Sequence, residues 1–390
     1  MTAISYRSEV IKIGSLTMGG DLPVRVQSMT STDTLDTAGS VSQCIRIIEA
    51  GGELVRLTAQ GVREAENLSN IKRELRKAGF DTPLCADIHF NPAAAEVAAR
   101  IVEKVRINPG NYADKRASFI RQELSENEYM AELERIRERL LPLIRICSEI
   151  GTAVRIGVNH GSLSDRIMTR YGNTPEGMAV SAIEFLKIFR DEGFRNLVVS
   201  MKSSDTRVMV ESNRILVRMM AEEGMRFPVH LGITEAGEGE DGRIISAAGI
   251  GTLLSEGIGD TIRVSLSEAP EREIPVAREI ISAVAGPAGR VKAPSAPLPH
   301  RKAGERYHPQ VYSERGVSFL DENGGMQESE VLTLEADELK RCCHLQAYNA
   351  ILNPVFSEDD PEKLAIDAAS LLGRFFIARQ PAGLCINNRG

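Results

Sequence analysis

Three short segments between residues 200 and 265 each end in a polar side chain that could take part in a reaction. The first segment ends at Lys202, the second at Glu235, and the third at Arg263 followed by Ser265. Each polar residue follows a short apolar run, as in a parallel barrel whose strands carry an active site at their carboxyl ends. A lysine, an acid and an arginine at one rim suit an anionic ligand that receives a proton.

Similar apolar runs elsewhere also end in polar residues, among them Arg56 with Thr58, Asp87 with His89, Arg106 with Asn108, and Arg155 with Asn159. Five cations therefore gather at the strand ends, with only two carboxylates plainly opposite them. A single arginine at a barrel rim can be an ordinary structural ion pair, but five buried cations without counter-charge are costly. We therefore predict a pocket for a diphosphate or a bis-phosphorylated small molecule, whose oxygens fit arginine and lysine donors.

Proton transfer is expected from Asp87 or Glu235, since both are carboxylates at strand ends. Glu235 lies in the segment TEAGEGEDGR, which could equally be a solvated, mobile loop. Two other chemistries stay open. Asp87, His89 and His230 could bind a divalent metal, and Lys202 could form a Schiff base as in barrel aldolases.

The elements that position these residues are eight short, β-branched runs: VRVQSM from residue 24, ELVRLT from 53, PLCADI from 83, KVRIN from 104, TAVRIGV from 152, NLVVS from 196, VHLGIT from 229 and TIRVS from 261. Helical patterns lie between them. Eight strand–helix units in tandem predict a (β/α)₈ TIM barrel. The connection over residues 108–151 is long and charged, and we expect an extra outer helix there.

Helix boundaries follow from local residues. Asn91-Pro92 and Thr174-Pro175 each place a capping residue before a proline at the first helical position. Residues 131–150 show helical spacing of apolar side chains, and Pro142 within them predicts a kink or a break.

Composition excludes several classes of protein. The 390 residues carry a net charge of −7, which argues against a general nucleic-acid binder. No apolar run approaches the length that crosses a bilayer. The first residues do not resemble a signal peptide. We therefore expect a cytoplasmic protein that does not span a membrane. The six cysteines include the adjacent pair Cys342-Cys343 and the late Cys385, but no C-x-x-C. Buried, inert thiols are the usual interpretation, although Cys342-Cys343 could help bind a metal.

A change of composition near residue 286 predicts the domain organisation. Residues 1–286 form the substrate-binding TIM barrel, and the Pro- and Gly-rich residues 287–306 form a linker. Residues 307–390 predict a small or incomplete α/β second domain, in which PEKLAIDAASLLGRFFI reads as an amphipathic helix.

Eight motifs together resemble one enzyme family: VQSMTSTDTLD, VRLTAQG, ADIHFNP, VRINPGN, RIGVNHGSLSDRI, SMKSSD, LGITEAGEGEDGRIISAAGIGTLL and GDTIRVSLSE. The family is 4-hydroxy-3-methylbut-2-enyl diphosphate synthase of the methylerythritol phosphate route to isoprenoids, in its larger, plant-like bacterial form. The motifs cover nearly all of residues 10–275.

The resemblance implies a TIM barrel that binds 2-C-methyl-D-erythritol 2,4-cyclodiphosphate. It implies a two-electron reductive ring opening with loss of water, through a [4Fe-4S] cluster reduced by ferredoxin or flavodoxin, in a homodimer. It implies that the diphosphate is held by Arg56, Arg106, Arg155, Lys202, Arg263 and Ser265. It also implies hydrogen bonds from His89 and Asn159, with Glu235 as the acid and Asp87 beside it.

The sequence departs from the family in one respect. The family holds its cluster with a C-x-x-C, a third cysteine and a glutamate in a C-terminal domain, and no such pattern occurs here. We therefore expect this chain to be the N-terminal part of the enzyme, with a partial inserted domain over residues 307–390. It would bind the cyclodiphosphate but be inactive alone, since ordinary side chains cannot supply electrons. A barrel transferase or aldolase, and a non-catalytic phosphometabolite-binding protein, remain alternatives.

Overall fold

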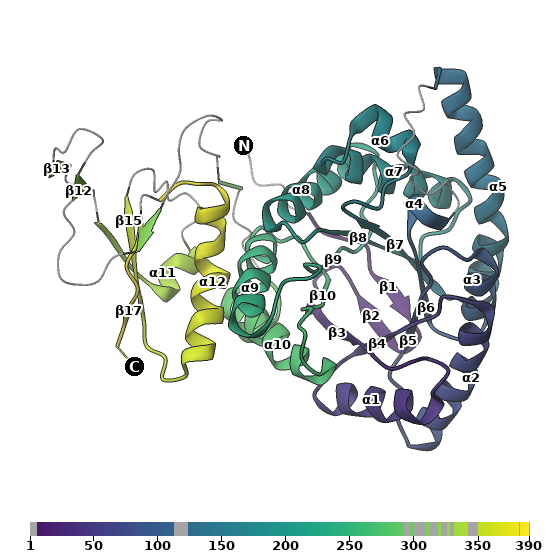
Figure 1. Ribbon diagram of the computed structural model, residues 1–390, viewed down its shortest axis with the longest axis horizontal. Helices are drawn as coiled ribbons and strands as arrows, with labels where there is room; N and C mark the ends of the chain where they lie inside the picture. The colour runs from purple at the N-terminus through teal and green to yellow at the C-terminus, as the bar shows by residue number, and fades with distance from the viewer. Residues whose placement is uncertain are drawn as a thin grey trace.

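The computed structural model describes residues 6–112, 124–291, 297–298, 309–311, 319–320, 326–327, 331–341, 350–381 and 383–389. Eight parallel strands form its main body (Figure 1). They are β3 (Arg25–Met29), β4 (Leu54–Thr58), β5 (Leu84–Asp87), β6 (Lys104–Ile107), β7 (Ala153–Asn159), β8 (Leu197–Lys202), β9 (His230–Leu231) and β10 (Thr261–Ile262). Their order is β8-β7-β6-β5-β4-β3-β10-β9, and a bridge between Val199 and Val229 closes the ring. The predicted TIM barrel is confirmed, with one strand in each expected run.

The strands alternate between an apolar outer face and a polar inner face. In β6, Val105 and Ile107 belong to the main hydrophobic core that lies under the outer helices. Lys104 and Arg106 are buried on the opposite face of the same strand. An ordinary barrel interior is filled with branched apolar side chains, so charged residues here mark an interior that serves a ligand.

A short hairpin closes the amino-terminal end of the barrel. It consists of β1 (Ile11–Ile13) and β2 (Leu16–Met18), which pair antiparallel. Ile13 and Met18 are fully buried and pack with residues at the starts of four barrel strands, Leu54, Cys85, Ala153 and Val198. The hairpin therefore seals the end opposite the strand carboxyl termini.

The outer helices are α1 (Thr37–Glu49), α2 (Val62–Lys77), α3 (Pro92–Ala99), α4 (Pro109–Tyr112), α5 (Glu126–Ile150), α6 (Asp165–Tyr171), α7 (Pro175–Asp191), α8 (Thr206–Glu222), α9 (Gly239–Ser255) and α10 (Glu273–Ala285). The two predicted caps are confirmed: the Asn91 side chain accepts from Ala94 N at 3.3 Å, and Thr174 accepts from Gly177 N at 3.0 Å. The long, charged connection contains one long outer helix, α5, but α5 is the connecting helix of the fourth strand–helix unit and not an additional one. Pro142 does not break α5, which runs through it as one helix, and the alternative of a kink stays a prediction. Buried Leu140 and Leu143 pack on both sides of the proline, and this packing offsets one lost hydrogen bond.

The described part of the second region contains a parallel sheet and two helices. The sheet comprises β11 (Gln310–Val311), β14 (Val331–Glu335), β15 (Ile351–Phe356), β16 (Gly383–Leu384) and β17 (Asn387–Asn388), while β12 (Phe319–Leu320) and β13 (Met326–Gln327) form a separate pair. The helices are α11 (Ala336–Arg341) and α12 (Pro361–Ile377), and α12 confirms the predicted amphipathic helix. Most of the predicted linker lies outside the described residues, so the domain boundaries stay a prediction.

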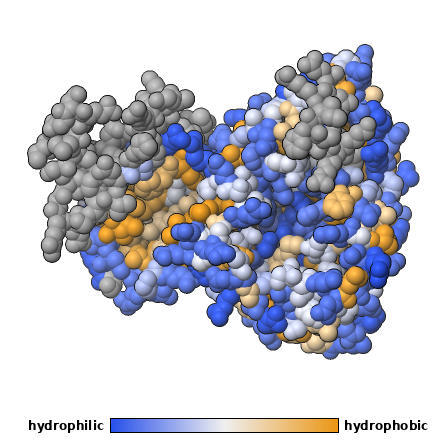
Figure 2. Space-filling view, viewed as in Figure 1, coloured by the Kyte–Doolittle hydropathy of each residue, from blue (hydrophilic) through white to orange (hydrophobic). Residues whose placement is uncertain are grey.

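Helix α12 packs directly on the barrel, beside α9 and α10 (Figure 1). Two glycines allow the close approach. A Cβ at Gly251 of α9 would lie 2.7 Å from the backbone of Ser370, and one at Gly373 of α12 would lie 2.6 Å from the backbone of Ala248. An apolar groove of about 730 Å³ runs beside this crossing. Figure 2 shows hydrophobic surface on the second region next to the barrel.

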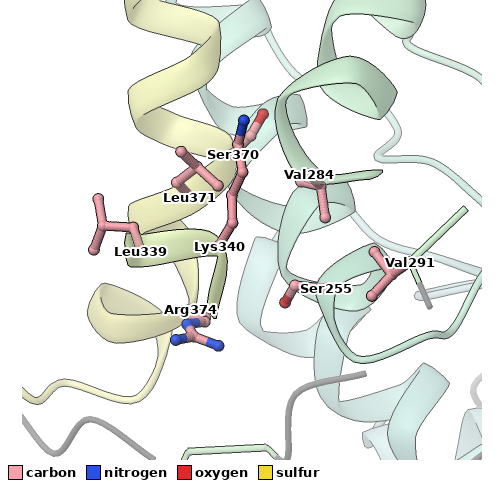
Figure 3. Close-up of a pocket in the computed structure, with 8 residues that line it drawn as sticks. All are labelled: Ser255, Val284, Val291, Leu339, Lys340, Ser370, Leu371 and Arg374. Atoms are coloured by element: carbon pink, nitrogen blue, oxygen red, sulfur yellow. The ribbon is translucent and has the colours of Figure 1, made fainter. Parts of the chain in front are cut away.

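A smaller cavity lies within the same interface (Figure 3). Its volume is about 20 Å³, which is room for one water molecule. Ser370 and Arg374 reach it from α12, and Ser255 reaches it from α9. The Ser370 hydroxyl has no hydrogen-bond partner among the described residues, so a single bound water would satisfy it. The second region is therefore joined to the barrel by a packed, partly polar contact.

No helix within the described residues is both long enough and apolar enough to cross a membrane.

Candidate active site

Asp87, at the carboxyl end of β5, is the centre of the polar network inside the barrel. Its carboxylate lies 3.0 Å from Arg106 Nη1, 3.3 Å from Arg56 Nε and 3.5 Å from His89 Nε2. Arg106 also donates to Gly157 O at 3.0 Å and to Asn159 Oδ1 at 3.5 Å. Five sequence-predicted residues therefore meet in one network.

The charge state of Asp87 follows from these contacts. Burial raises the pKa of this carboxyl, but the charges of Arg106 and Arg56 outweigh burial and hold the pKa well below its usual range. Asp87 therefore stays ionised at neutral pH. It suits the task of orienting the two arginines better than the task of donating a proton.

Arg263 has a counter-ion that the sequence pattern does not reveal. Its Nε and Nη2 donate to Glu273 at 3.1 and 2.9 Å, and Glu273 is 1% exposed at the start of α10. Met29 Sδ lies between Arg263 and Arg56, and it accepts from Arg56 Nη2 at 2.8 Å. Glu273 begins a helix eleven residues after the end of β10, and only the fold brings it under the rim.

Two glycines make room for the cations. A Cβ at Gly232 would lie 2.8 Å from Lys202 Nζ, and one at Gly157 would lie 2.5 Å from Arg106 Nε. Lys202 is nearly buried, and its amine makes no hydrogen bond or ion pair with another described residue. Burial, with the charge of Arg56 next, lowers the pKa of Lys202 well below its usual range. A buried lysine without a carboxylate partner is a position at which an anionic ligand could bind.

Arg155 lies deeper than the strand end at which the sequence places it. Its side chain is 2% exposed, and its Nη1 lies 2.6 Å from Nδ1 of the fully buried His230. Because a guanidinium only donates, Nδ1 must accept and the ring proton lies on Nε2. Burial and then the charge of Lys202 lower the pKa of His230 well below its usual value, so this ring is neutral.

Lys104 is a sixth interior cation that the strand-end argument omits. It begins β6, is fully buried, and its Nζ has no hydrogen-bond partner in the described chain. The signal was present in the sequence, because Lys104 stands two residues before Arg106 and a strand repeats its faces every second residue.

The remaining predicted residues lie at the rim. Ser265 is half-buried, two residues beyond Arg263, and Asn159 is half-buried beside Arg106. Glu235 is exposed in the loop before α9, and its backbone takes a left-handed conformation with φ of 54°. That conformation costs a non-glycine residue about 1–2 kcal/mol, and such strain concentrates at functional sites. Among the described residues, no hydrogen bond or ion pair joins the Glu235 side chain to the network.

The candidate metal sites receive no support from the geometry. Across the described ranges, no three histidine, cysteine, aspartate or glutamate side chains come together around one point. His230 uses Nδ1 for Arg155 instead of meeting Asp87 and His89. Cys385 is buried and free, whereas Cys342 and Cys343 lie outside the described residues.

Comparison with known proteins identifies the barrel. Residues 8–278 match the GcpE TIM-barrel domain, which is more than half of the chain. This chain belongs to the GcpE family.

Two relatives that match this barrel share a name. A protein of Parabacteroides distasonis named 4-hydroxy-3-methylbut-2-en-1-yl diphosphate synthase (flavodoxin) is 61% identical over 275 residues, covering 70% of this chain and 45% of the relative. A protein of the same name in Chlorobaculum tepidum is 53% identical over 281 residues, covering 71% of this chain and 38% of the relative. The chain thus spans less than half the length of these relatives.

Among solved structures, N-acetylneuraminic acid synthetase of Leptospira borgpetersenii resembles the GcpE barrel with a TM-score of 0.46 and 11% identity, over 71% of this chain and 90% of that one. At that distance the likeness carries nothing about function.

The GcpE barrel interior holds more positive than negative charge. Its six cations are Arg56, Lys104, Arg106, Arg155, Lys202 and Arg263, and its two carboxylates are Asp87 and Glu273. His230 is neutral, so six less two leaves four positive charges when both lysines are protonated, and four less two leaves two when neither is. Such an excess in a buried site is stable only beside anions or with some groups unprotonated.

Proposed function

We propose that this chain is the substrate-binding part of a 4-hydroxy-3-methylbut-2-enyl diphosphate synthase and binds 2-C-methyl-D-erythritol 2,4-cyclodiphosphate in the barrel mouth. The excess of buried positive charge carries the proposal, because a diphosphate supplies the missing anions. Membership of the GcpE family and the shared name of its relatives support this particular diphosphate.

The proposed roles follow from position and charge. The guanidinium groups of Arg56, Arg106, Arg155 and Arg263 and the Lys202 amine attract and orient the diphosphate, with hydrogen bonds from Ser265, His89 and Asn159. Asp87 stays ionised and fixes the directions of Arg56 and Arg106. Glu235, on its strained loop, is the proposed acid that protonates the departing hydroxyl.

The proposed reaction is a two-electron reductive ring opening with loss of water, in isoprenoid synthesis in the cytoplasm. In the family a [4Fe-4S] cluster supplies the electrons when bound. The described side chains do not fit that cluster, because no three histidine, cysteine, aspartate or glutamate side chains come together among them. Flavodoxin, named in the relatives, is the proposed electron donor, with ferredoxin as the alternative and a homodimer as the proposed assembly.

Isothermal titration calorimetry with the cyclodiphosphate tests the binding proposal. The variant Lys202→Met removes a nearly buried amine that makes no ion pair with a described residue, so we expect the variant to fold. Loss of one charge-assisted hydrogen bond is worth about 1.5–3 kcal/mol, which is a roughly 10- to 150-fold weaker affinity. Lys77→Met, at an exposed lysine of α2, is the matched control and should bind like the wild type. Absence of binding heat, or equal affinity in Lys202→Met, contradicts the proposal.

A second candidate is an aldolase, because an amine with a lowered pKa is what a Schiff-base lysine requires. Borohydride trapping with a phosphorylated aldehyde or ketone, followed by peptide mass analysis, separates the two. A reduced adduct on Lys202 supports the aldolase, and its absence together with cyclodiphosphate binding supports the synthase.

A further inference from the structure

Four neighbouring strands contribute a buried polar layer below the barrel mouth. Lys104 comes from β6, Arg155 from β7, Ser200 from β8 and His230 from β9, and none is more than 2% exposed. Each carries an atom without a hydrogen-bond partner in the described residues: Lys104 Nζ, Arg155 Nε, Ser200 Oγ and His230 Nε2. Lys104 lies closest to the sealed end, since its neighbours in register are Cys85 and Ala153 of the hairpin-covered cluster.

This layer contains donors but almost no acceptors. Arg155 Nε only donates, and His230 Nε2 donates because Nδ1 accepts from Arg155. The Ser200 hydroxyl can act either way. A protonated Lys104 would add a third donor without a partner, together with an unpaired buried charge, whereas a neutral amine carries a lone pair that can accept.

The charges of the site match the ligand when the lysines are set aside. The four guanidinium groups less Asp87 and Glu273 leave two positive charges. The proposed cyclic diphosphate has one ionised oxygen on each phosphorus, which balances those two charges. Ring opening turns it into a linear diphosphate with a further ionisable oxygen. The lysines are then the groups that can compensate additional negative charge, because arginines do not titrate in this range.

We propose that Lys104 is a positioning residue of the site, which gains a proton as a diphosphate fills the mouth and so adjusts the charge of the barrel without touching the ligand. This inference rests on the proposed function, since it requires a diphosphate to bind. Lys202 can titrate as well, but it lies at the end of β8, where it is proposed to contact the ligand, so replacing it would change both the charge and direct binding.

The surroundings of Lys104 support proton uptake. Burial, followed by the charges of Arg155 and Arg56, lowers the pKa of Lys104 to about 8 against the opposing influence of Cys85 and Asp87. An arriving diphosphate reverses part of this by adding negative charge nearby. The charged and titratable groups that face Lys104 are Arg56 on β4, Cys85 and Asp87 on β5, Arg155 on β7 and His230 on β9.

The direction of the pH effect follows from linkage. Below about pH 7 Lys104 already holds its proton in the free protein, so binding takes up none there. Above about pH 8 the proton must come from solvent, so the affinity falls by up to tenfold per pH unit for each proton taken up. The linear diphosphate should take up more protons than the cyclic one.

Calorimetric titrations of the full 390-residue chain in two buffers of different ionisation enthalpy measure the protons taken up. Inorganic pyrophosphate and the cyclodiphosphate are the probes, at about pH 7 and about pH 8.5. We expect uptake at the higher pH in the wild type, and a loss of up to one proton, with a flatter pH profile, in Lys104→Met. Lys77→Met is the matched control and should keep the wild-type uptake.

Folding of the variant is checked by its melting temperature, which should not fall, because methionine replaces an amine without a partner. Lys104→Gln is a second neutral variant, in which proton uptake can be measured if Lys104→Met does not fold. Binding with equal proton uptake in wild type and both variants overturns the role of Lys104 but leaves the proposed function standing. If the wild type binds neither probe, the proposed function itself is overturned.

Discussion

Asp87→Asn removes the shared counter-ion of two buried arginines while keeping the size of the side chain. The carboxylate is 3% exposed and lies 3.0 and 3.3 Å from the guanidinium groups of Arg106 and Arg56. Removing one partner of a buried ion pair costs about 3–5 kcal/mol. At about 2–4 °C per kcal/mol, we expect the melting temperature to fall by roughly 6–20 °C.

The pH dependence of this loss has a definite sign. The pKa of Asp87 is held well below its usual range in the folded protein. Its contribution to stability is therefore fully present above the ordinary aspartate pKa of about 3.9, and it is lost as the pH falls through the folded pKa. The difference in melting temperature between wild type and Asp87→Asn should stay constant between about pH 5 and about pH 8.

Differential scanning calorimetry with and without pyrophosphate measures both effects. Pyrophosphate should raise the melting temperature of Asp87→Asn by more than it raises that of the wild type, because the variant has one more uncompensated positive charge. Asp81→Asn is the matched control, since Asp81 is 88% exposed beside Arg76 and its pair is worth at most about 1 kcal/mol. A change of less than about 2 °C in Asp87→Asn, or equal changes in both variants, refutes the reasoning.

Three further predictions concern backbone positions. Gly232→Ala places a methyl group 2.8 Å from Lys202 Nζ and 2.7 Å from Arg263 O. We expect the free energy of unfolding to fall by about 1–3 kcal/mol and calorimetry to show weaker binding of the cyclodiphosphate. The control is Gly61→Ala, whose methyl group meets only the flexible end of Glu64. Gly251→Ala drives a methyl group against the Ser370 backbone at 2.7 Å, and limited proteolysis should then cut the second region faster while binding at the mouth is unchanged. Glu235→Gly relieves about 1–2 kcal/mol of backbone strain, while the greater freedom of glycine in the unfolded chain costs about 0.4–1 kcal/mol. The melting temperature of this variant should therefore not fall. A clear fall that is absent from Glu235→Gln would show that the loop is unstrained.

The strands could be predicted because their apolar runs are short, β-branched and separated by helical patterns. The rule that a barrel binds ligands at its strand ends then selects most of the candidate residues, including Arg56, Asp87 and Arg106, which meet as expected. The strand runs and the polar residues that follow them are local signals, and each can be recognised within about ten residues of sequence.

The features that the pattern did not reveal depend on contacts between distant segments. Glu273 pairs with Arg263 from a helix, and Arg155 turns inward to His230 of another strand. The docking of α12 on α9 depends on Gly251 meeting Ser370 across more than one hundred residues of chain. Lys104 differs from these features, because its position two residues before Arg106 is visible in the sequence. The rule that selects residues at strand ends does not include it.

The sealed floor of the barrel has a practical consequence for handling the protein. Because the β1–β2 hairpin fills the amino-terminal end with Ile13 and Met18, a ligand must enter and leave through the same opening. The hairpin turn at Gly14 and Ser15 is exposed at the closed end. A tether attached at Ser15 would hold the molecule on a sensor surface with its opening toward the flowing solution. Association and dissociation could then be timed without the surface blocking the route.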